Sequence, residues 1–263
     1  MTLAYPTELN LEQYELLYSL LPTAATTGRP RSVNLMLVMQ GILYVLVSGC
    51  AWRLLPQQYP PYSTVYYYFR KWRDDGTWKR VHDHLVEWVR VMEDRYSTPS
   101  AGSMDSQTVP TSAMVNQSVG YDAAKKLKGR KRFALVDTLG LLMMVKVVAA
   151  SVPEREGAKQ LLYQVHQERS RFPRLMRIWV DAGFSGEDFL RSIMDWFGWV
   201  LDVVLRPNGT QGFVLLPKRW TVERTYGWLH WCRRLNVDYE RLPASSEALI
   251  YIAMIRLMLR RLA

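Results

Sequence analysis

The sequence predicts an α/β fold, a mixed sheet with flanking helices, preceded by an all-α region. Residues 10–95 place apolar side chains at helical spacing. After the small-residue stretch STPSAGS (97–103), short apolar runs typical of strands alternate with amphipathic helical segments. We therefore expect an N-terminal helical domain over 1–96 and a second, α/β domain over 97–263.

The N-terminal region reads as a series of helical segments with recognisable start and stop signals. Asn10 is a side-chain cap for the first segment, and Gly49 is a natural end for the second. Pro60 and Pro61 precede Ser63, which we expect to cap the helix that follows. The expected segments are 10–21, 33–49, 51–56, 64–75 and 78–95.

The helix predicted over 64–75 is a candidate for DNA recognition. It follows a short helical turn and a tight connection, the order of a helix-turn-helix, whose second helix enters the major groove. The residues expected to contact DNA are Tyr67, Arg70, Lys71 and Arg73. A four-helix bundle whose charges are merely solvated is the alternative that this stretch leaves open.

The stretch VNLMLVMQGILYVLVSGCAW (33–52) is long and apolar enough to raise the possibility of a membrane span. Polar or small residues interrupt it at Asn34, Gln40, Gly41 and Ser48. No second hydrophobic span accompanies it, so a buried domain helix is the favoured reading.

The second region alternates strand-like and helix-like segments in the order of a mixed sheet. Two β-rich runs flank a DTLG turn, with Asp137 and Gly140 at its first and fourth positions. The chain ends in a helix begun by Ser245 or Ser246, which we expect to pack on the sheet and to offer Arg256, Arg260 and Arg261 to solvent or DNA. The other predicted segments are a strand at about 103–107, a hairpin over 133–148, a helix over 155–172, a strand within 175–186, a helix over 186–197, a strand over 199–207 and a helix beginning near 218.

The charge balance indicates a polyanionic partner. The chain has 34 Lys and Arg against 24 Asp and Glu, a net charge of +10. This favours nucleic acid over a membrane surface. Cys50 and Cys232 lie far apart with no CxxC pair, which argues against structural zinc or disulfides and fits a reducing cytosol. With no signal-peptide cleavage site near the start, we expect a cytoplasmic protein, associated with the nucleoid when it binds DNA.

Three acidic residues occupy positions where catalysis is plausible. Asp105 and Asp181 lie where strands end, and Glu223 lies on a basic, aromatic helix beside Arg219. Three converging carboxylates repel one another and need a divalent cation, and oxygen ligands favour Mg²⁺ or Mn²⁺. Two such ions can clamp the attacking and leaving oxygens of a phosphoryl transfer. Taken singly, each Asp could instead cap a turn, and Glu223 with Arg219 could be an ordinary i, i+4 ion pair.

Over nearly its whole length, the chain resembles the DDE transposases of bacterial insertion sequences, in the large group numbered five. The matching segments are DSQTV (105–109), GYDAAKKLKGRKRF (120–133), VDTLGLL (136–142), REGAKQLL (155–162), DAGFSG (181–186), LPKRWTVERTYGWL (216–229), RRLNVDYERLP (233–243) and IAMIRLMLRRL (252–262). The resemblance implies an RNase H-like catalytic domain in which Asp105, Asp181 and Glu223 bind metal. It also implies an N-terminal domain that binds transposon ends, and cutting by a metal-activated water followed by attack of the freed 3′-hydroxyl on target DNA.

The chain departs from the family's signature around the glutamate, Tyr-x2-Arg-x3-Glu-x6-Lys. Arg219 and Glu223 match, but Leu216 replaces the tyrosine and His230 replaces the lysine. A histidine is only partly charged near neutral pH. We still expect His230 to act at the site, with Arg233 or Arg234 as the alternative cation.

The basic run AKKLKGRKR (124–132) is expected to follow a DNA backbone near the active site. A solvated charged loop is the alternative. Asp122 and Asp137 are interpreted as loop and turn residues. The cations expected to contact DNA outside the N-terminal region are Lys125, Lys126, Lys128, Arg130, Lys131, Arg132, Lys218, Arg233 and Arg234.

The resulting hypothesis is a Mg²⁺- or Mn²⁺-dependent DNA transposase with two metal ions. It would bind terminal inverted repeats and target DNA, and it would act as a homodimer or higher oligomer because two ends must be cut in one complex. The alternatives are a catalytically silent, transposase-derived DNA-binding protein and a metal-dependent nuclease without strand transfer.

Overall fold

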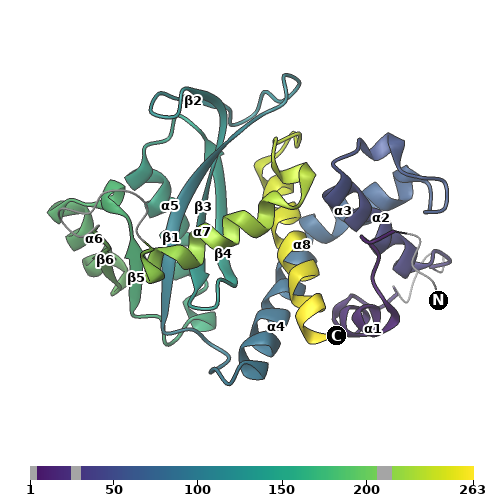
Figure 1. Ribbon diagram of the computed structural model, residues 1–263, viewed down its shortest axis with the longest axis horizontal. Helices are drawn as coiled ribbons and strands as arrows, with labels where there is room; N and C mark the ends of the chain where they lie inside the picture. The colour runs from purple at the N-terminus through teal and green to yellow at the C-terminus, as the bar shows by residue number, and fades with distance from the viewer. Residues whose placement is uncertain (1–4, 25–30, 206–214) are drawn as a thin grey trace.

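The computed structural model describes residues 5–24, 31–205 and 215–263. Figure 1 shows a sheet with covering helices at one end and a group of helices at the other, with α8 between them. The helices are α1 (Leu11–Leu20), α2 (Leu35–Ser48), α3 (Tyr62–Asp74), α4 (Thr77–Met92), α5 (Glu154–Gln167), α6 (Glu187–Phe197), α7 (Pro217–His230) and α8 (Pro243–Leu262), with single turns η1 (Trp52–Leu54), η2 (Arg169–Arg171), η3 (Ala182–Phe184) and η4 (Arg233–Leu235). The strands are β1 (Ala101–Pro110), β2 (Gly120–Asp122), β3 (Leu127–Asp137), β4 (Leu142–Ala149), β5 (Arg177–Val180) and β6 (Val200–Val203).

The sheet is mixed, as expected. Strands β4, β3 and β1 are successive antiparallel neighbours, β5 and β6 continue the sheet in parallel, and β2 pairs with β3. This order with helices on the sheet confirms the RNase H-like fold. The last two residues of the strand predicted over 199–207 lie outside the described part of the chain.

Helix α5 covers one face of the sheet, and a glycine permits its close approach. A side chain at Gly157 would place its Cβ only 2.1 Å from Phe133 Cε2. Phe133 belongs to β3 and is fully buried. The neighbouring residue on this strand, Ala134, faces the opposite side because side chains alternate along a strand. That opposite side is the face of α7 and of Asp105, whose register partner is Ala134.

The N-terminal helices and α8 bury one continuous apolar core. It contains Leu17 of α1, Ile42 of α2, Phe69 of α3, Leu85 of α4 and Ile252 of α8. The same core continues to β3 and β4 of the sheet. A helix from the predicted second domain therefore completes the packing of the first. The division at residues 96 and 97 stays a prediction about folding units.

Most helix ends follow their predicted signals, with two corrections. The C-terminal helix α8 begins at Pro243 with Leu242 at the N-cap position, and not at Ser245 or Ser246. Asn10 and Gln13 form a reciprocal capping box at α1, and Gly49 ends α2 in the left-handed conformation at φ 75°. The predicted Ser63 cap is wrong. Helix α3 begins at Tyr62 with Pro61 at the N-cap position, and Ser63 lies inside the first turn.

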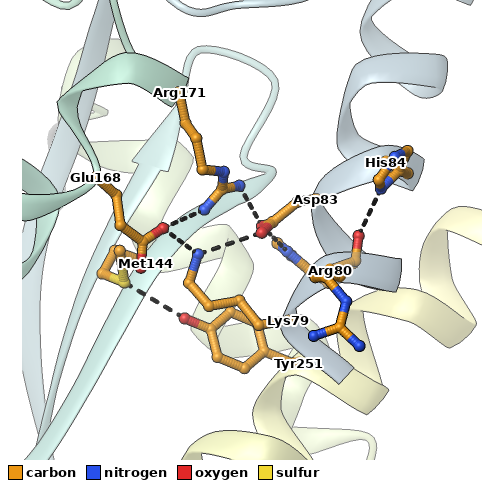
Figure 2. Close-up of polar contacts among 9 residues, drawn as sticks. Lys79, Arg80, Asp83, His84, Met144, Glu168, Arg171 and Tyr251 are labelled. Carbon is orange, nitrogen blue, oxygen red and sulfur yellow. Dashed lines mark hydrogen bonds and ion pairs between the residues drawn. The ribbon is translucent and has the colours of Figure 1, made fainter. Parts of the chain in front are cut away.

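Two polar clusters fasten α4 to the α/β part. Arg90 donates to the carboxylate of Asp137, and both side chains are buried. Figure 2 shows the second cluster, in which Lys79 and Asp83 of α4 meet Glu168 and Arg171 beside η2. Asp137 does begin the predicted turn, since it accepts from Gly140 N at 3.0 Å. Its side chain, however, also joins the two parts of the fold.

The apolar segment over 33–52 forms α2 and η1, and much of α2 is buried against the other helices. None of the described helices has both the length and the hydropathy that crossing a membrane requires.

Candidate active site

Two of the predicted acidic residues lie side by side because their strands are neighbours. Asp105 is in the middle of β1, and Asp181 comes directly after β5. The parallel register pairs Ser103 with Trp179. Continuing that register by two residues sets Asp181 beside Asp105, on the same face of the sheet. Each carboxylate also accepts a local backbone hydrogen bond, from Ser106 N at 2.7 Å and from Gly183 N at 2.9 Å.

Helix α7 brings Glu223 near the two aspartates. Tyr226, one turn later, is buried and its hydroxyl donates to the backbone oxygens of Asp105 at 2.9 Å and Arg132 at 3.0 Å. Thr225 donates to Gly140 O at 2.7 Å. These bonds fix the rotation of α7 about its axis. Glu223, on the neighbouring arc of the helix, is held toward the two aspartates.

Arg219 bridges two of the three carboxylates. Its Nη2 lies 3.2 Å from Glu223 Oε1 and 3.9 Å from Asp181 Oδ2. The i, i+4 pair that the sequence indicates is therefore present, but the same guanidinium also reaches an acid from a different element. It partly neutralises a site that would otherwise hold three like charges.

The electrostatics of Asp105 reflect this crowding. Its pKa is raised to about 7, chiefly by burial; the Asp181 and Glu223 carboxylates act in the same direction, while the Ser106 amide and Arg219 oppose the rise. Added positive charge nearby would favour the ionised form of this carboxyl at neutral pH.

The donor set matches a hard divalent cation in its chemistry. Three carboxylates from β1, the end of β5 and α7 supply only oxygen, which suits Mg²⁺ or Mn²⁺. In the arrangement of the described residues, no three His, Cys, Asp or Glu side chains are close enough to hold one ion together. Arg219 contacts Asp181 and Glu223 in this arrangement.

His230 also lies on this side of the sheet, where it contacts a residue that the sequence did not single out. Its Nε2 lies 2.8 Å from Gln107 Nε2. Gln107 follows Asp105 by two residues on β1 and so shares its face of the sheet. The sequence could have indicated Gln107 only through its spacing of two residues from Asp105. That spacing means a shared face only if both residues lie on one strand.

The structure corrects part of the predicted DNA-contacting set. Strand β3 begins at Leu127 and runs in the interior of the sheet, so Arg130, Lys131 and Arg132 are buried. Arg130 pairs with Asp238 at 3.1 Å, and Lys131 pairs with Glu154 at 3.3 Å and Asp122 at 3.7 Å.

Two further cations of that set are engaged inside the protein. Arg234 is buried against Glu240 at 2.7 Å, and Arg73 donates to Ser245 at 2.6 Å. In this conformation these side chains cannot meet a DNA backbone. Those that remain exposed are Lys125, Lys126, Lys128, Lys218 and Arg233, together with Tyr67, Arg70 and Lys71 on α3.

The exposed face of α3 keeps the features expected of a recognition helix. Lys71 lies 6.0 Å from the ring centre of Tyr67, and Arg70 lies 5.4 Å from that of Tyr66. Tyr67, Arg70 and Lys71 border a surface hollow of about 470 Å³ together with Asp74 and Asp75.

Comparisons with known proteins match both parts of the chain to transposases. The family model described as "Transposase DDE domain" matches residues 96–258, and "Putative transposase of IS4/5 family" matches residues 9–82. The chain is 34% identical over 64 residues to a protein of Burkholderia cepacia named as a putative transposase for insertion sequence element IS402. That alignment covers 24% of this chain and 29% of the relative. No solved structure matches.

Proposed function

The chain belongs to the transposase DDE domain family, and on that premise we propose that it cuts and joins DNA at the ends of an insertion sequence. Asp105, Asp181 and Glu223 are proposed to hold two Mg²⁺ or Mn²⁺ ions. The observation that carries this is that Arg219 contacts both Asp181 and Glu223, and that the charges of all three groups act on the carboxyl of Asp105. Ions bound there would supply positive charge beside the attacking and leaving oxygens of a phosphoryl transfer.

The chain's own residues would prepare the site for that charge. Asp105 is half-buried and gives up its proton with difficulty, because its pKa is raised to about 7 by burial and by the adjoining acids. Tyr226 fixes the backbone that carries Asp105. Arg219 holds Asp181 and Glu223 in place, and it is free to turn to a DNA phosphate once another cation balances the acids.

His230 is proposed to meet a phosphate beside the acids. Gln107 holds the ring at 2.8 Å, so the side chain is oriented although it is exposed. Lys218, at the start of α7, and Arg233, just after it, extend the basic surface in both directions along the helix.

The N-terminal helices are proposed to bind the terminal inverted repeats through α3. Its exposed Tyr67, Arg70 and Lys71 have the character of residues that read or follow a DNA groove. Two ends must be cut in one complex, so we propose a homodimer or higher oligomer assembled on double-stranded DNA.

The test is metal-dependent nicking of a labelled duplex that carries the matched inverted repeats flanking the gene. Asp181→Ala should abolish nicking while α3-dependent binding of the repeat persists. Asp188→Ala, an exposed acid on α6, is the matched control and should cut normally. Nicking retained by Asp181→Ala would refute the assigned site.

Two alternative functions predict different products. A catalytically silent, transposase-derived DNA-binding protein would bind the repeats without metal-dependent nicking. A nuclease would nick, but it would not join a pre-cut end with a 3′-hydroxyl to a target plasmid. Joined products distinguish the transposase from both.

A further inference from the structure

A groove lies between the C-terminal end of α7 and helix α8, on a flank that the proposed active site does not use. It encloses about 280 Å³. Trp228 and Trp231 form one wall, and Arg256, Arg260 and Arg261 of α8 form the other. Within the described part of the chain, no Asp or Glu lines it. We call it the α7–α8 groove.

The groove is built around a tryptophan held between two guanidinium groups. The Cζ atoms of Arg224 and Arg261 lie 4.8 and 5.0 Å from the ring centre of Trp228. A cation over an indole ring is stabilised by the ring's quadrupole. Arg261 lines the groove, whereas Arg224 lies outside its lining and donates to Leu139 O at 2.9 Å.

The positive charge of the groove is incompletely balanced. Burial and the neighbouring Arg260 lower the pKa of Arg256. Burial and Arg224 lower the pKa of Arg261, and Glu93 and Asp137 partly oppose that second shift. Arg260 donates to the backbone oxygen of Pro6 at 2.8 Å, which is an uncharged partner. Arg256 Nε is buried without a hydrogen-bond partner among the described residues. An anion entering the groove would relieve this repulsion.

Trp231 adds an exposed aromatic surface to the same groove. Its side chain is 73% exposed, the most exposed tryptophan in the described part of the chain. A large apolar ring in solvent beside arginines is the combination that stacks on unpaired bases while the cations follow the backbone.

The groove and the acids lie on different sides of α7. Trp231 follows Glu223 by eight residues, which is about 12 Å along the helix axis. Trp228 is displaced from Glu223 by roughly 140° around the helix. A strand whose phosphodiester sits at the acids would have to pass around α7 to reach the groove.

We propose that the α7–α8 groove binds a single-stranded segment of DNA. Its arginines take the phosphates, and Trp231 stacks on a base, without sequence preference. The arginines and the exposed tryptophan of the groove suit a polyanion with flat apolar faces. That this polyanion is DNA rests on the proposed function.

The test is the affinity of the full chain for a fluorescently labelled, mixed-sequence oligonucleotide, measured by anisotropy in EDTA so that no cutting intervenes. Trp231→Leu should weaken single-strand binding about tenfold, as expected for one lost stacking contact, and should leave duplex binding unchanged. Trp196→Leu removes another exposed tryptophan, on α6, and should change neither.

The salt dependence tests the arginines separately. The double variant Arg260→Gln/Arg261→Gln removes two proposed phosphate contacts. Each contact to a single strand contributes about 0.7 to the slope of log binding constant against log salt concentration, so the slope should fall by about 1.4. The control Arg174→Gln/Arg191→Gln removes equal charge outside the groove and should leave the slope unchanged. Thermal melting of each variant verifies that it is folded.

The outcomes separate this proposal from the proposed function. Unchanged single-strand affinity and salt slope in folded groove variants would overturn the groove site, whatever the result of the nicking assay. Altered sedimentation of Trp231→Leu with unchanged affinity would also overturn it, because the groove would then be a contact between copies of the chain. Groove-dependent binding in a protein that never nicks DNA would support the groove and reject the catalytic proposal.

Discussion

Arg219 of α7 contacts two carboxylates from different elements, Glu223 at 3.2 Å and Asp181 at 3.9 Å. A guanidinium in that position partly neutralises the two acids. A divalent cation bound to the proposed site would compete with Arg219 for the same oxygens.

Removing Arg219 should make the acid site more dependent on metal. In Arg219→Gln the three carboxylates repel one another without compensation, so we expect a lower melting temperature in EDTA. The loss should be no more than about 1 kcal/mol because the groups are partly exposed. Mn²⁺ should then raise the melting temperature of Arg219→Gln more than that of the wild type. An equal Mn²⁺-induced shift in both proteins would show that Arg219 does not compete with the ion.

Breaking the buried Arg90–Asp137 pair should be among the most damaging single changes. Arg90→Met leaves Asp137 buried without its cation, and burial already raises the pKa of this carboxyl. An orphaned buried charge of this kind costs about 3–5 kcal/mol. Urea denaturation measures the loss of unfolding free energy.

The double variant Arg90→Met/Asp137→Asn is the control for that prediction. It removes both charges, so it should recover part of the lost stability. If the double variant is less stable than Arg90→Met, the pair is not the source of the effect.

Two glycines should respond in opposite directions to alanine. At Gly157 the added Cβ meets the Phe133 ring at 2.1 Å, and forcing α5 away from the sheet should cost about 1–3 kcal/mol. At Gly227 nothing lies within 4 Å of the added Cβ. There alanine should stabilise α7 by about 0.5–1 kcal/mol because it lowers the entropy cost of helix formation.

Urea denaturation of the two alanine variants checks both signs in one experiment. Equal losses at the two positions would show that the packing of Phe133 against α5 is not the deciding factor.

Stability should fall as the solution is acidified from about pH 7.5 to 5.5, partly because of His82. This ring is buried between Asp83 and the ring of Tyr251. Burial lowers its pKa, despite the opposing effect of Asp83. The unfolded chain takes up a proton near pH 6.5 while the folded chain does not, so protonation favours unfolding. The stabilising contribution is complete above that pH and is lost below it.

Comparing melting curves of His82→Gln and His84→Gln at the two pH values tests this assignment. The first variant should show a shallower dependence on pH than the wild type. The second removes an exposed histidine on the same helix and should keep the wild-type dependence. An unaltered pH profile in His82→Gln would assign the effect to other groups.

Local patterns predicted the elements well because they are set by local physics. Asn10 and Gly49 mark helix ends through backbone bonds and φ values that neighbouring residues determine. The DTLG turn and the alternation of strands and helices after residue 97 are likewise local. The Ser63 prediction failed because Pro61, two residues earlier, occupies the N-cap position, and the sequence does not show which of two competing signals prevails.

Long-range partners could not be predicted from the sequence. The sequence of a basic run is the same whether the run forms an exposed loop or enters an interior strand. Arg130 can be buried because it pairs with Asp238, which is more than one hundred residues away in the sequence. Asp137 read as a turn residue because its partner Arg90 lies 47 residues upstream. Glu223 was placed beside Asp105 and Asp181 through the resemblance, and the structure supplies the bridging role of Arg219.

Asp105, Asp181 and Glu223 are proposed to bind divalent metal together. Titration with Mn²⁺, followed by the electron paramagnetic resonance signal of the free ion, tests it most directly. We expect saturable binding in the wild type and in Asp188→Asn, and loss of that binding in Asp105→Asn, Asp181→Asn and Glu223→Gln alike. Undiminished Mn²⁺ binding in all three triad variants would contradict it.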